Sequence, residues 1–340
     1  MQSGKSVGEK RLLDLSISVV NWNTKDILRN CLKSIYVSTH KIDYEIFVVD
    51  NGSSDGSPEM VENEFPQVNL MRNTENLGFA KANNQAIELS NGRYILLLNS
   101  DTIVLDGALG KMVEFMGNHP DAGAAGCRLL NPDGSLQKSI GNFPTLLSAY
   151  WANSLLRKIF PRIVIEHIIN DPQVYLQIRE VDWMFGAFLI LRKNAIKLVG
   201  SLDERFFMYA EEIDLCYRLK RKGWKIYFCP TTRVVHLRER SAKKIENDRT
   251  AIRKAKGMYY YYRKRYGFVG LLLTRSFSAF CSGRRLLTWC IAYLLLSTRR
   301  HETWKKIKII WFSFKISVCP MKKYDPRNSK ERELRESLTL

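Results

Sequence analysis

An acidic residue lies three positions after a short and very apolar segment of the sequence. Residues Tyr94–Leu98 read Tyr-Ile-Leu-Leu-Leu, and the next three residues are Asn99, Ser100 and Asp101. A short apolar run of this kind predicts a buried parallel strand that ends in a loop. Open α/β sheets bind ligands beyond the carboxyl ends of their strands, so Asp101 is a candidate ligand for a metal ion beside a phosphate group. An isolated Asp in this position more often begins a turn, so other residues must support the site.

Further polar residues lie where other predicted strands end or helices begin. Asp50 and Gly52 follow the predicted strand Tyr44–Val49, and Gly78 precedes a predicted helix. His236 ends a predicted strand later in the chain. A neutral imidazole can bind a metal ion, although a histidine at a strand end is more often simply hydrogen-bonded. Together these positions predict a ligand site that several strand ends share.

A cluster of acidic residues opens the predicted helix Glu211–Lys222. A carboxylate in such a position can take a proton from a reacting hydroxyl group as a general base. Glu211 and Glu212 are adjacent, so they point in different directions from the helix and cannot have the same role. Asp214 and Arg218 are four residues apart, a spacing that predicts an ion pair within the helix.

The elements that must position these residues alternate along the first hundred residues. Thr24 follows the first strand and is predicted to cap the first helix with its hydroxyl group. Strands joined by helices in this order predict right-handed βαβ crossovers and a parallel sheet. No Gly-x-Gly-x-x-Gly segment follows the first strand, so the dinucleotide-binding fingerprint is absent. The four predicted strands are Leu15–Val20, Tyr44–Val49, Val68–Met71 and Tyr94–Leu98.

The following region has a less regular pattern. It predicts a helix at Gly107–Asn118 and one strand within Val181–Leu191, beside the site. Two short strands are predicted at Ile226–Cys229 and Arg233–Val235. Residues 143–178 predict either a helical insertion or a loop over the site.

Charge divides the chain into a nearly neutral body and a basic tail. The net charge is +19, and residues 241–340 contain 24 of the 53 Lys and Arg residues but only 7 of the 34 Asp and Glu residues. We therefore predict a polar N-terminal tail (1–11), an α/β domain (12–240) and a basic helical region (241–340). The first segment lacks the apolar core of a signal peptide, and the seven Cys are scattered, as is typical of reduced thiols in a cytosol.

The basic region favours a membrane surface over nucleic acid as its partner. Its Lys and Arg residues are interleaved with aromatic and aliphatic runs such as Met258–Tyr262 and Leu286–Leu296. This mixture suits the interface of an anionic bilayer better than a nucleic-acid duplex. No apolar run reaches the roughly 20 residues needed to span a bilayer. We therefore expect helices that lie on the membrane without crossing it.

Six segments within residues 15–237 together resemble motifs of the family 2 glycosyltransferases, which are nucleotide-sugar enzymes. The resemblance implies a GT-A fold, a Rossmann-like α/β domain with a mainly parallel central sheet and flanking helices. The motifs are most similar to those of the rhamnosyltransferase branch, whose members use dTDP-rhamnose and often act on polyprenyl-linked acceptors. The segments are Val19-Val20-Asn21-Trp22-Asn23, Val49-Asp50-Asn51-Gly52-Ser53, Asn76-Leu77-Gly78-Phe79-Ala80 with Asn83-Asn84, Leu98-Asn99-Ser100-Asp101, Gly200–Phe207 and Tyr209–Asp214.

The resemblance also implies roles for individual residues. Asp101 matches the second acid of the family's Asp-x-Asp motif and would bind a divalent cation, Mg²⁺ or Mn²⁺, together with His236. Asn99 stands where the family has the first acid, a departure that removes one charge from the metal site. Asp50 matches the acid that reads the N–H of a pyrimidine ring. The other residues implied to border the nucleotide are Val20, Asn21, Asn23, Gly52, Gly78, Asn99 and Ser100.

The same comparison implies that the reaction inverts the sugar and uses one general base. The family's Glu-Asp pair stands here as Glu211-Glu212, so Glu212 is the expected base, one methylene group longer than usual. Trp183, Gly186 and Glu211 are implied to contact the sugar or the acceptor.

The leading hypothesis is a metal-dependent inverting transfer of L-rhamnose from dTDP-rhamnose to a polyprenyl-diphosphate-linked saccharide, in the synthesis of a cell-surface polysaccharide. The enzyme would be peripheral, at the cytoplasmic face of a bacterial inner membrane. Other donors, such as UDP-galactofuranose or UDP-glucose, form the first alternative. The second is a non-catalytic protein of the same fold that binds membranes or nucleic acid. The oligomeric state is left open.

Overall fold

The structure is a computed structural model that describes residues 13–39, 41–105, 107–153, 167–237, 246–295 and 300–318. The predicted N-terminal tail lies outside the described residues. The described chain divides into two compact units. The first unit contains the described residues up to 143 and those of 167–237, and the second contains those of 144–153 and everything from 246 onward.

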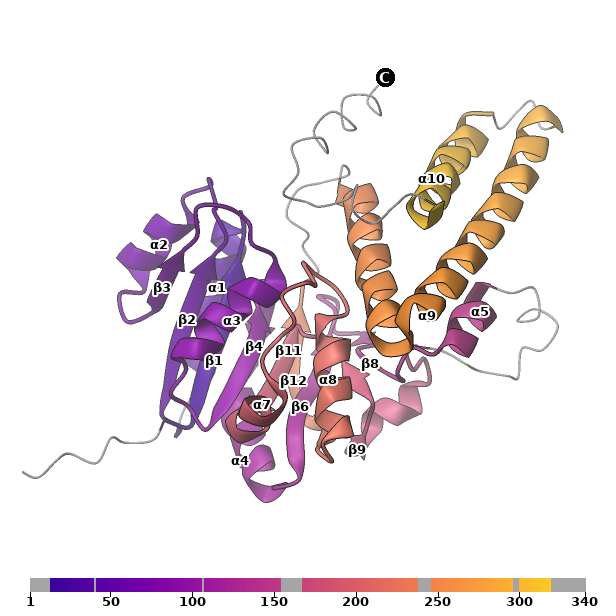
Figure 1. Ribbon diagram of the computed structural model, residues 1–340. Helices are drawn as coiled ribbons and strands as arrows, with labels where there is room; N and C mark the ends of the chain where they lie inside the picture. The colour runs from indigo at the N-terminus through magenta and orange to yellow at the C-terminus, as the bar shows by residue number, and fades with distance from the viewer. Residues whose placement is uncertain are drawn as a thin grey trace, which may run out of the picture. The chain divides into compact units, whose positions relative to one another are not determined.

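A large mixed sheet organises the first unit (Figure 1). Its strand order is β3-β2-β1-β4-β11-β6-β12-β5, with β7 beside β6 and β9 beside β12. β10 and β8 form a separate pair. The strands are β1 Leu15–Asn21, β2 Tyr44–Asp50, β3 Asn69–Arg72, β4 Tyr94–Asn99, β5 Thr102–Val104, β6 Ala122–Leu130, β7 Leu136–Gln137, β8 Ile140–Gly141, β9 Arg179–Glu180, β10 Trp183–Met184, β11 Phe188–Arg192 and β12 Lys225–His236.

The helices cover both faces of this sheet. α1, α2 and α4 bury their apolar residues in the main core, whereas α3 and α8 pack on the other face, in front of the sheet in Figure 1. Because both faces are covered, β1, β2 and β4 are buried along most of their length, which fits the apolar runs of β2 and β4 and leaves Ser16 and Ser18 of β1 buried. The helices of this unit are α1 Lys25–Ser38, α2 Ser57–Glu64, α3 Phe79–Leu89, α4 Ala108–Asn118, η1 Pro172–Leu176, α7 Lys193–Val199 and α8 Glu211–Arg221.

The sheet is parallel in its first half and mixed in its second half. β1 is parallel to β2 and β4, and β2 is parallel to β3, as predicted. β11 runs antiparallel to both of its neighbours, β4 and β6, and β5 runs antiparallel to β12. The four strands predicted first therefore form the parallel half of the sheet, and they end at one edge.

Two strand predictions from the second half need correction. The strand expected within Val181–Leu191 is split into β10 and β11, because the Phe185 N–H bonds to the Ser139 carbonyl and the Ala187 carbonyl accepts from Asn99 N–H. The two short strands expected near the end of this unit are one strand, β12, with an irregular register between Cys229 and Arg233.

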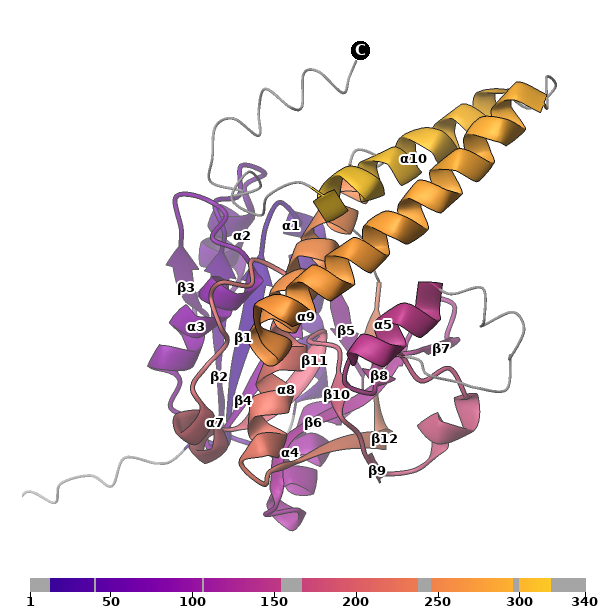
Figure 2. The same ribbon diagram turned by 45° about the vertical axis from the view of Figure 1, so that its right-hand side comes forward.

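The second unit consists of helices α5 Leu146–Asn153, α9 Glu246–Leu295 and α10 Arg300–Val318. Gly267 has non-helical backbone angles (φ 68°, ψ −164°), so α9 is two helical segments joined by a kink. α10 lies alongside the segment that follows this kink (Figure 2). None of the helices described by the structure is long and apolar enough to cross a membrane.

Candidate active site

The parallel strands bring predicted site residues together at their carboxyl ends. In the sheet register Asn21 at the end of β1 pairs with Asp50 at the end of β2, and Val20 pairs with Asn99 at the end of β4. Three of the sequence motifs therefore meet at one edge of the sheet. This is the place where an open α/β sheet binds its ligand.

Hydrogen bonds hold the Asp50 carboxylate in one orientation. Asp50 is only 2% exposed; its Oδ1 accepts from the Asn21 amide at 2.9 Å, and its Oδ2 accepts from the Ser53 backbone N–H at 2.8 Å. The Ser53 hydroxyl accepts from the backbone N–H of Asn23, which has a left-handed backbone (φ 54°). Ser54 N–H donates to the Asn23 side-chain oxygen at 2.7 Å. The loops after β1 and β2 thus form one rigid hydrogen-bonded unit.

Thr24 links this unit to the next strand and does not cap its helix. Thr24 occupies the N-cap position of α1, but its side chain makes no capping hydrogen bond. Its hydroxyl instead donates to the Asn21 side-chain oxygen at 2.6 Å and lies 3.3 Å from the Ser100 hydroxyl. The predicted cap is therefore wrong, because a side-chain partner within the site takes the place of the helix backbone.

Asp101 and His236 meet beside Ser100. Asp101 Oδ1 lies 3.2 Å from His236 Nε2, and the Asn99 amide nitrogen lies 3.4 Å from the same Nε2. The backbones are also joined, because Leu237 N–H donates to the Asp101 carbonyl at 2.8 Å. On the far side of the ring, His236 Nδ1 lies 2.7 Å from Gln137 Oε1. The structure thus brings the two predicted metal ligands together.

The Asp101 and His236 side chains fit a divalent cation. Two ligands at right angles, each about 2.1 Å from a metal ion, lie about 3 Å apart, and the Asp101 and His236 atoms are 3.2 Å apart. A carboxylate and a neutral imidazole are both established metal ligands. Within the described part of the chain, no group of three or more His, Cys, Asp and Glu side chains could hold a metal ion. The remaining ligands of an ion here would come from a bound molecule or from water.

Glu211 and Glu212 begin α8 after a strained turn. Tyr209 and Ala210 both have left-handed backbones (φ 75° and 73°), which side chains with a Cβ atom rarely adopt. Such strain is typical of functional sites. The Oε2 atoms of Glu211 and Glu212 are both buried and have no hydrogen-bond partner among the described residues. Two buried carboxylate oxygens without a protein partner are suited to contact a bound molecule.

Burial separates the proton affinities of these two carboxyl groups. Desolvation raises the pKa of Glu212 to about 7. Desolvation and the charge of Glu212 raise the pKa of Glu211 well above its usual value. Both shifts favour the protonated, neutral carboxyl group, and Glu212 gains and loses its proton near neutral pH. A pKa near the operating pH is the property that a general base requires.

Gly186 and Ala187 connect Glu212 to the strand ends. A Cβ atom added to Gly186 would lie 4.0 Å from the Glu212 Cβ and 3.6 Å from the Phe79 ring. The next residue, Ala187, accepts a hydrogen bond from Asn99 N–H at 3.1 Å. Asp50, Asp101 and Glu212 therefore lie around the same sheet edge, although they are far apart in the sequence.

Several residues of the motifs have packing partners within the protein. A Cβ atom at Gly78 would lie 2.4 Å from the Phe207 carbonyl oxygen, and one at Gly52 would lie 3.0 Å from the Glu75 backbone. Trp183 is buried, and its indole N–H donates to the Asn142 carbonyl at 2.8 Å. Close packing accounts for these residue types, so their predicted contacts with nucleotide or sugar stay predictions.

Hydrogen bonds join residues 200–207 to α3 and to α8. Asn84 on α3 bonds to both backbone groups of Leu202, at 2.8 and 3.0 Å. Arg218 forms the predicted ion pair with Asp214 at 2.8 Å and also donates to the carbonyls of Val199, Gly200 and Ser201. The sequence predicted the ion pair but missed these carbonyl contacts and the hydrogen bond between Gln137 and His236, which lie 99 residues apart.

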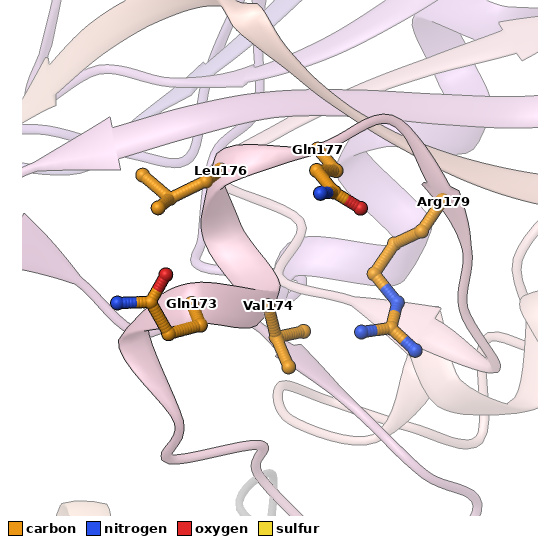
Figure 3. Close-up of a pocket in the computed structure, with 5 residues that line it drawn as sticks. All are labelled: Gln173, Val174, Leu176, Gln177 and Arg179. Atoms are coloured by element: carbon orange, nitrogen blue, oxygen red, sulfur yellow. The ribbon is translucent and has the colours of Figure 1, made fainter.

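A separate hollow lies away from these residues. It has a volume of about 440 Å³ and is lined by Gln173, Val174, Leu176, Gln177 and Arg179, on η1 and the segment leading into β9 (Figure 3). None of these residues belongs to the motifs, and apart from the half-buried Val174 they are exposed. The hollow therefore adds nothing to the candidate active site.

Known proteins share the sequence pattern of this site. Residues 16–176, which include Asp50 and Asp101, match the family model described as glycosyl transferase family 2. The chain carries a family 2 glycosyltransferase domain. This glycosyltransferase is 28% identical over 233 residues to the N-acetylglucosaminyl-diphospho-decaprenol L-rhamnosyltransferase of Mycobacterium tuberculosis, a match that covers 65% of this chain and 75% of that protein. It is 29% identical over 167 residues to the rhamnosyltransferase WbbL of Escherichia coli, covering 47% and 60% of the two chains.

Solved structures show the fold of the glycosyltransferase. A mannosyltransferase from Pyrobaculum calidifontis, in complex with GDP-Man and Mn²⁺, matches with a TM-score of 0.54 and 15% identity, over 93% of this chain and 89% of that one. GalNAc-T7 with UDP, GalNAc and Mn²⁺ also matches with a TM-score of 0.54, at 16% identity, over 77% of this chain and about half (52%) of that one. These likenesses confirm the predicted GT-A fold.

Proposed function

We propose that this glycosyltransferase transfers L-rhamnose from dTDP-rhamnose to a polyprenyl-diphosphate-linked saccharide, with inversion and with a divalent cation. The observation that carries the proposal is the position of Glu212: a carboxyl group with a pKa near 7 lies beside the sheet edge where Asp101 and His236 meet. The printed names of the mycobacterial and E. coli relatives support rhamnose as the sugar. The mycobacterial name also supports a lipid-linked acceptor.

Each group of the site has a part in this reaction. Glu212 takes the proton of the acceptor hydroxyl group. At the same time the hydroxyl oxygen of the acceptor forms a bond to the anomeric carbon, and the bond from that carbon to the nucleoside diphosphate breaks. Glu211, whose protonated form is favoured by burial and by the charge of Glu212, donates a hydrogen bond to a sugar hydroxyl. Asp50, fixed by Asn21 and Ser53, accepts from the N–H of the thymine ring. Asp101 and His236 would hold a divalent cation, which would supply positive charge to stabilise the leaving diphosphate.

A panel of nucleotide sugars tests the donor. The purified protein is incubated with Mn²⁺ and with dTDP-rhamnose, UDP-galactofuranose or UDP-glucose, and release of the nucleoside diphosphate is measured with a polyprenyl-diphosphate-linked saccharide present. We expect turnover with dTDP-rhamnose that exceeds turnover with the UDP sugars by at least about tenfold, a difference of about 1.4 kcal/mol in transition-state binding. Faster turnover with a UDP sugar would replace rhamnose in the proposal but keep the glycosyl transfer. Turnover with none of the donors would contradict the transfer itself.

We also propose that the second unit holds the enzyme on an anionic membrane, where a lipid-linked acceptor is found. Eight large apolar side chains of the second segment of α9 are 42–75% exposed. At about 100° per residue they fall within an arc of about 140° on one face of the helix. We call this face the apolar stripe; it consists of Phe268, Val269, Leu272, Leu273, Phe280, Leu287, Ile291 and Leu294.

The opposite face of the same segment packs against α10. Arg275 donates to the Ser317 carbonyl at 2.9 Å, and the Lys306 ammonium lies 4.2 Å from the centre of the Trp289 ring. α9 therefore has apolar residues on two sides, of which α10 covers one. A helix of this kind requires a second apolar environment.

Charge indicates which environment covers the apolar stripe. Residues 268–295 and 300–318 contain eight Lys and Arg residues and one acidic residue, Glu302. Trp304 and Trp311 are exposed on α10, as is common at the interface between water and lipid. Cationic, aromatic and aliphatic groups together suit an anionic bilayer, because the two weak attractions add.

Vesicle binding tests the stripe with a matched pair of variants. Leu287→Glu places a charge in the apolar stripe, and Thr288→Glu places the same charge on an adjacent exposed residue outside it. Both lose the same electrostatic attraction, but only Leu287→Glu loses the burial of a leucine, worth about 1.5–3 kcal/mol. We expect Leu287→Glu to bind phosphatidylglycerol vesicles at least about tenfold more weakly than Thr288→Glu.

Other outcomes would overturn the membrane proposal. Equal binding of the two variants would show that the stripe does not enter the lipid. A dimer in the absence of lipid that Leu287→Glu dissociates would assign the stripe to a second copy of the chain. Tight retention on duplex DNA without vesicle binding would assign the basic region to nucleic acid.

A further inference from the structure

We propose that Gln137 is a positioning residue for the metal site: it fixes the Nδ1–H tautomer of His236 and so aims the Nε2 lone pair at Asp101. The inference rests on the proposed divalent cation, but it concerns a residue that no motif singled out. Gln137 lies on β7 and is only 1% exposed. Its partner His236 lies at the end of β12.

The hydrogen bonds of Gln137 leave its amide one orientation. The Nε2 group donates to the Asn131 side-chain oxygen at 3.0 Å and to the His236 backbone carbonyl at 3.2 Å. Both partners are acceptors, so a rotated amide would place its oxygen against two other oxygens. Oε1 therefore faces the ring, and His236 Nδ1 must donate the 2.7 Å hydrogen bond that joins them.

Asn131 is itself anchored by the turn that contains it. Its side-chain nitrogen donates to the Ser135 hydroxyl at 2.9 Å, and its backbone N–H donates to the Ser135 carbonyl at 2.8 Å. These bonds turn the Asn131 side-chain oxygen toward Gln137. A chain of fixed orientations thus runs from the turn at 131–135 through Gln137 to the imidazole of His236.

The hydrogen bond at Nδ1 of His236 determines the state of Nε2, on the other side of the ring. With the proton on Nδ1, His236 Nε2 carries a lone pair, and it lies 3.2 Å from Asp101 Oδ1. Two electron-rich atoms at this distance repel each other unless a positive charge lies between them. The network therefore prepares the pair to receive a cation, as outer hydrogen bonds do for many metal-binding histidines.

Nuclear magnetic resonance of ¹⁵N-labelled histidine tests the tautomer without metal. At about pH 8 the His236 signals, assigned with His236→Gln, are expected to show the Nδ1–H form in the metal-free protein. In Gln137→Met the Nδ1–H form should lose its dominance, because methionine has no oxygen acceptor. An Nε2–H form, or a doubly protonated ring, in the wild type would overturn the proposal.

Binding of Mn²⁺ in the presence of dTDP, followed by electron paramagnetic resonance, tests the effect on the site. Gln137→Met should weaken Mn²⁺ binding about 10–100-fold. Gln137→Glu keeps the Oε1 acceptor, and because burial favours a protonated carboxyl group, its second oxygen can carry a proton and donate in place of the amide Nε2. It should therefore bind Mn²⁺ within a few-fold of the wild type. A mere packing role predicts that the two variants bind Mn²⁺ alike, because methionine and glutamate have similar volumes.

Two further variants complete the design. Gln85 lies in α3, away from His236, and its side-chain amide donates a hydrogen bond to Asn73. Gln85→Met removes this amide and should leave Mn²⁺ binding unchanged. If Gln137→Glu does not fold, Asn131→Ala replaces it, with a smaller expected loss of affinity. A wild type that shows the Nδ1–H form but binds no Mn²⁺ with dTDP would contradict the proposed cation and leave the tautomer assignment intact.

Discussion

Two neighbouring glutamates with the same side chain have different proton affinities in this site. Burial raises the pKa of both, and the charge of Glu212 raises that of Glu211 further. Both effects favour the protonated form of Glu211, which can donate a hydrogen bond, so Glu211→Gln, a neutral donor of similar size, should keep most of the activity. Glu212 must lose its proton to act, so the two residues are not interchangeable.

The pH dependence of turnover follows from Glu212. The base acts only in its ionised form, and its pKa is about 7. We expect kcat/KM to rise about tenfold per pH unit below pH 7 and to level off above it. The measurement is the initial rate at saturating Mn²⁺ across this range. A profile that levels off near the ordinary glutamate pKa, about 4.3, would contradict the assigned role.

The same raised pKa predicts that Glu212 lowers stability above acidic pH. In the unfolded chain the carboxyl group ionises at its ordinary pKa, but in the folded protein it stays protonated up to about pH 7. The folded state is therefore favoured below the unfolded pKa and loses this advantage as the pH rises to about 7. Glu212→Gln should be more stable than the wild type by about 3 kcal/mol at pH 8, and equal to it near pH 4. Urea denaturation at the two pH values measures the difference.

The metal ligands predict a choice of cation. Imidazole suits transition metals, whereas Mg²⁺ prefers oxygen ligands. We expect turnover to be faster with Mn²⁺ than with Mg²⁺, and His236→Gln to reduce this preference. Asp101→Asn removes the charged ligand and should lower activity with both ions by at least about tenfold. Equal use of both ions by the wild type would contradict His236 as a ligand.

At the scale of elements, the sequence predicted those strands whose environment is uniform. β1, β2 and β4 are buried on both faces, so apolar runs were sufficient to find β2 and β4, and the β-branched residues of β1 indicated that strand. The break between β10 and β11 was not predictable, because it depends on hydrogen bonds to Ser139 and Asn99 from distant segments. Within residues 143–178 the structure has a helix, α5, and a short 3-10 helix, η1, and α5 belongs to the second unit. The local sequence pattern does not indicate which distant segments will form these hydrogen bonds or pack against α5.

Motif glycines also have element-scale roles that the resemblance did not reveal. Gly78, the residue before the first turn of α3, has a φ of 88°, and a Cβ atom there would lie 2.4 Å from the Phe207 carbonyl oxygen. Gly134 has a similar φ of 80° but open space around it. Gly134→Ala should cost about 1–2 kcal/mol from backbone strain alone, and Gly78→Ala should cost at least about 1 kcal/mol more from overpacking. If thermal denaturation shows that both variants lose the same free energy of unfolding, the close contact between position 78 and the Phe207 carbonyl oxygen would be contradicted.

At the scale of the whole molecule, the chain combines a catalytic unit with a basic helical unit. Composition alone located the basic region, because its Lys and Arg residues are concentrated in the last hundred positions. Composition could not show which face of α9 is exposed, since that depends on where α10 packs. The site motifs were found because the chemistry of the proposed site restricts the residue types there. Gln137 was missed because its hydrogen-bond partner, His236, lies 99 residues away in the sequence.

The central claim is that Glu212 is the base of a metal-dependent glycosyl transfer. The most direct test compares single-turnover transfer by the wild type, Glu212→Gln and the control Glu114→Gln, an exposed residue on α4, while Mn²⁺–dTDP affinity is measured in parallel. We predict that Glu212→Gln slows transfer by about 10²–10⁴-fold and changes the affinity by no more than a few-fold, while Glu114→Gln changes neither. Transfer by Glu212→Gln at a rate close to the wild type would show that another group takes the proton.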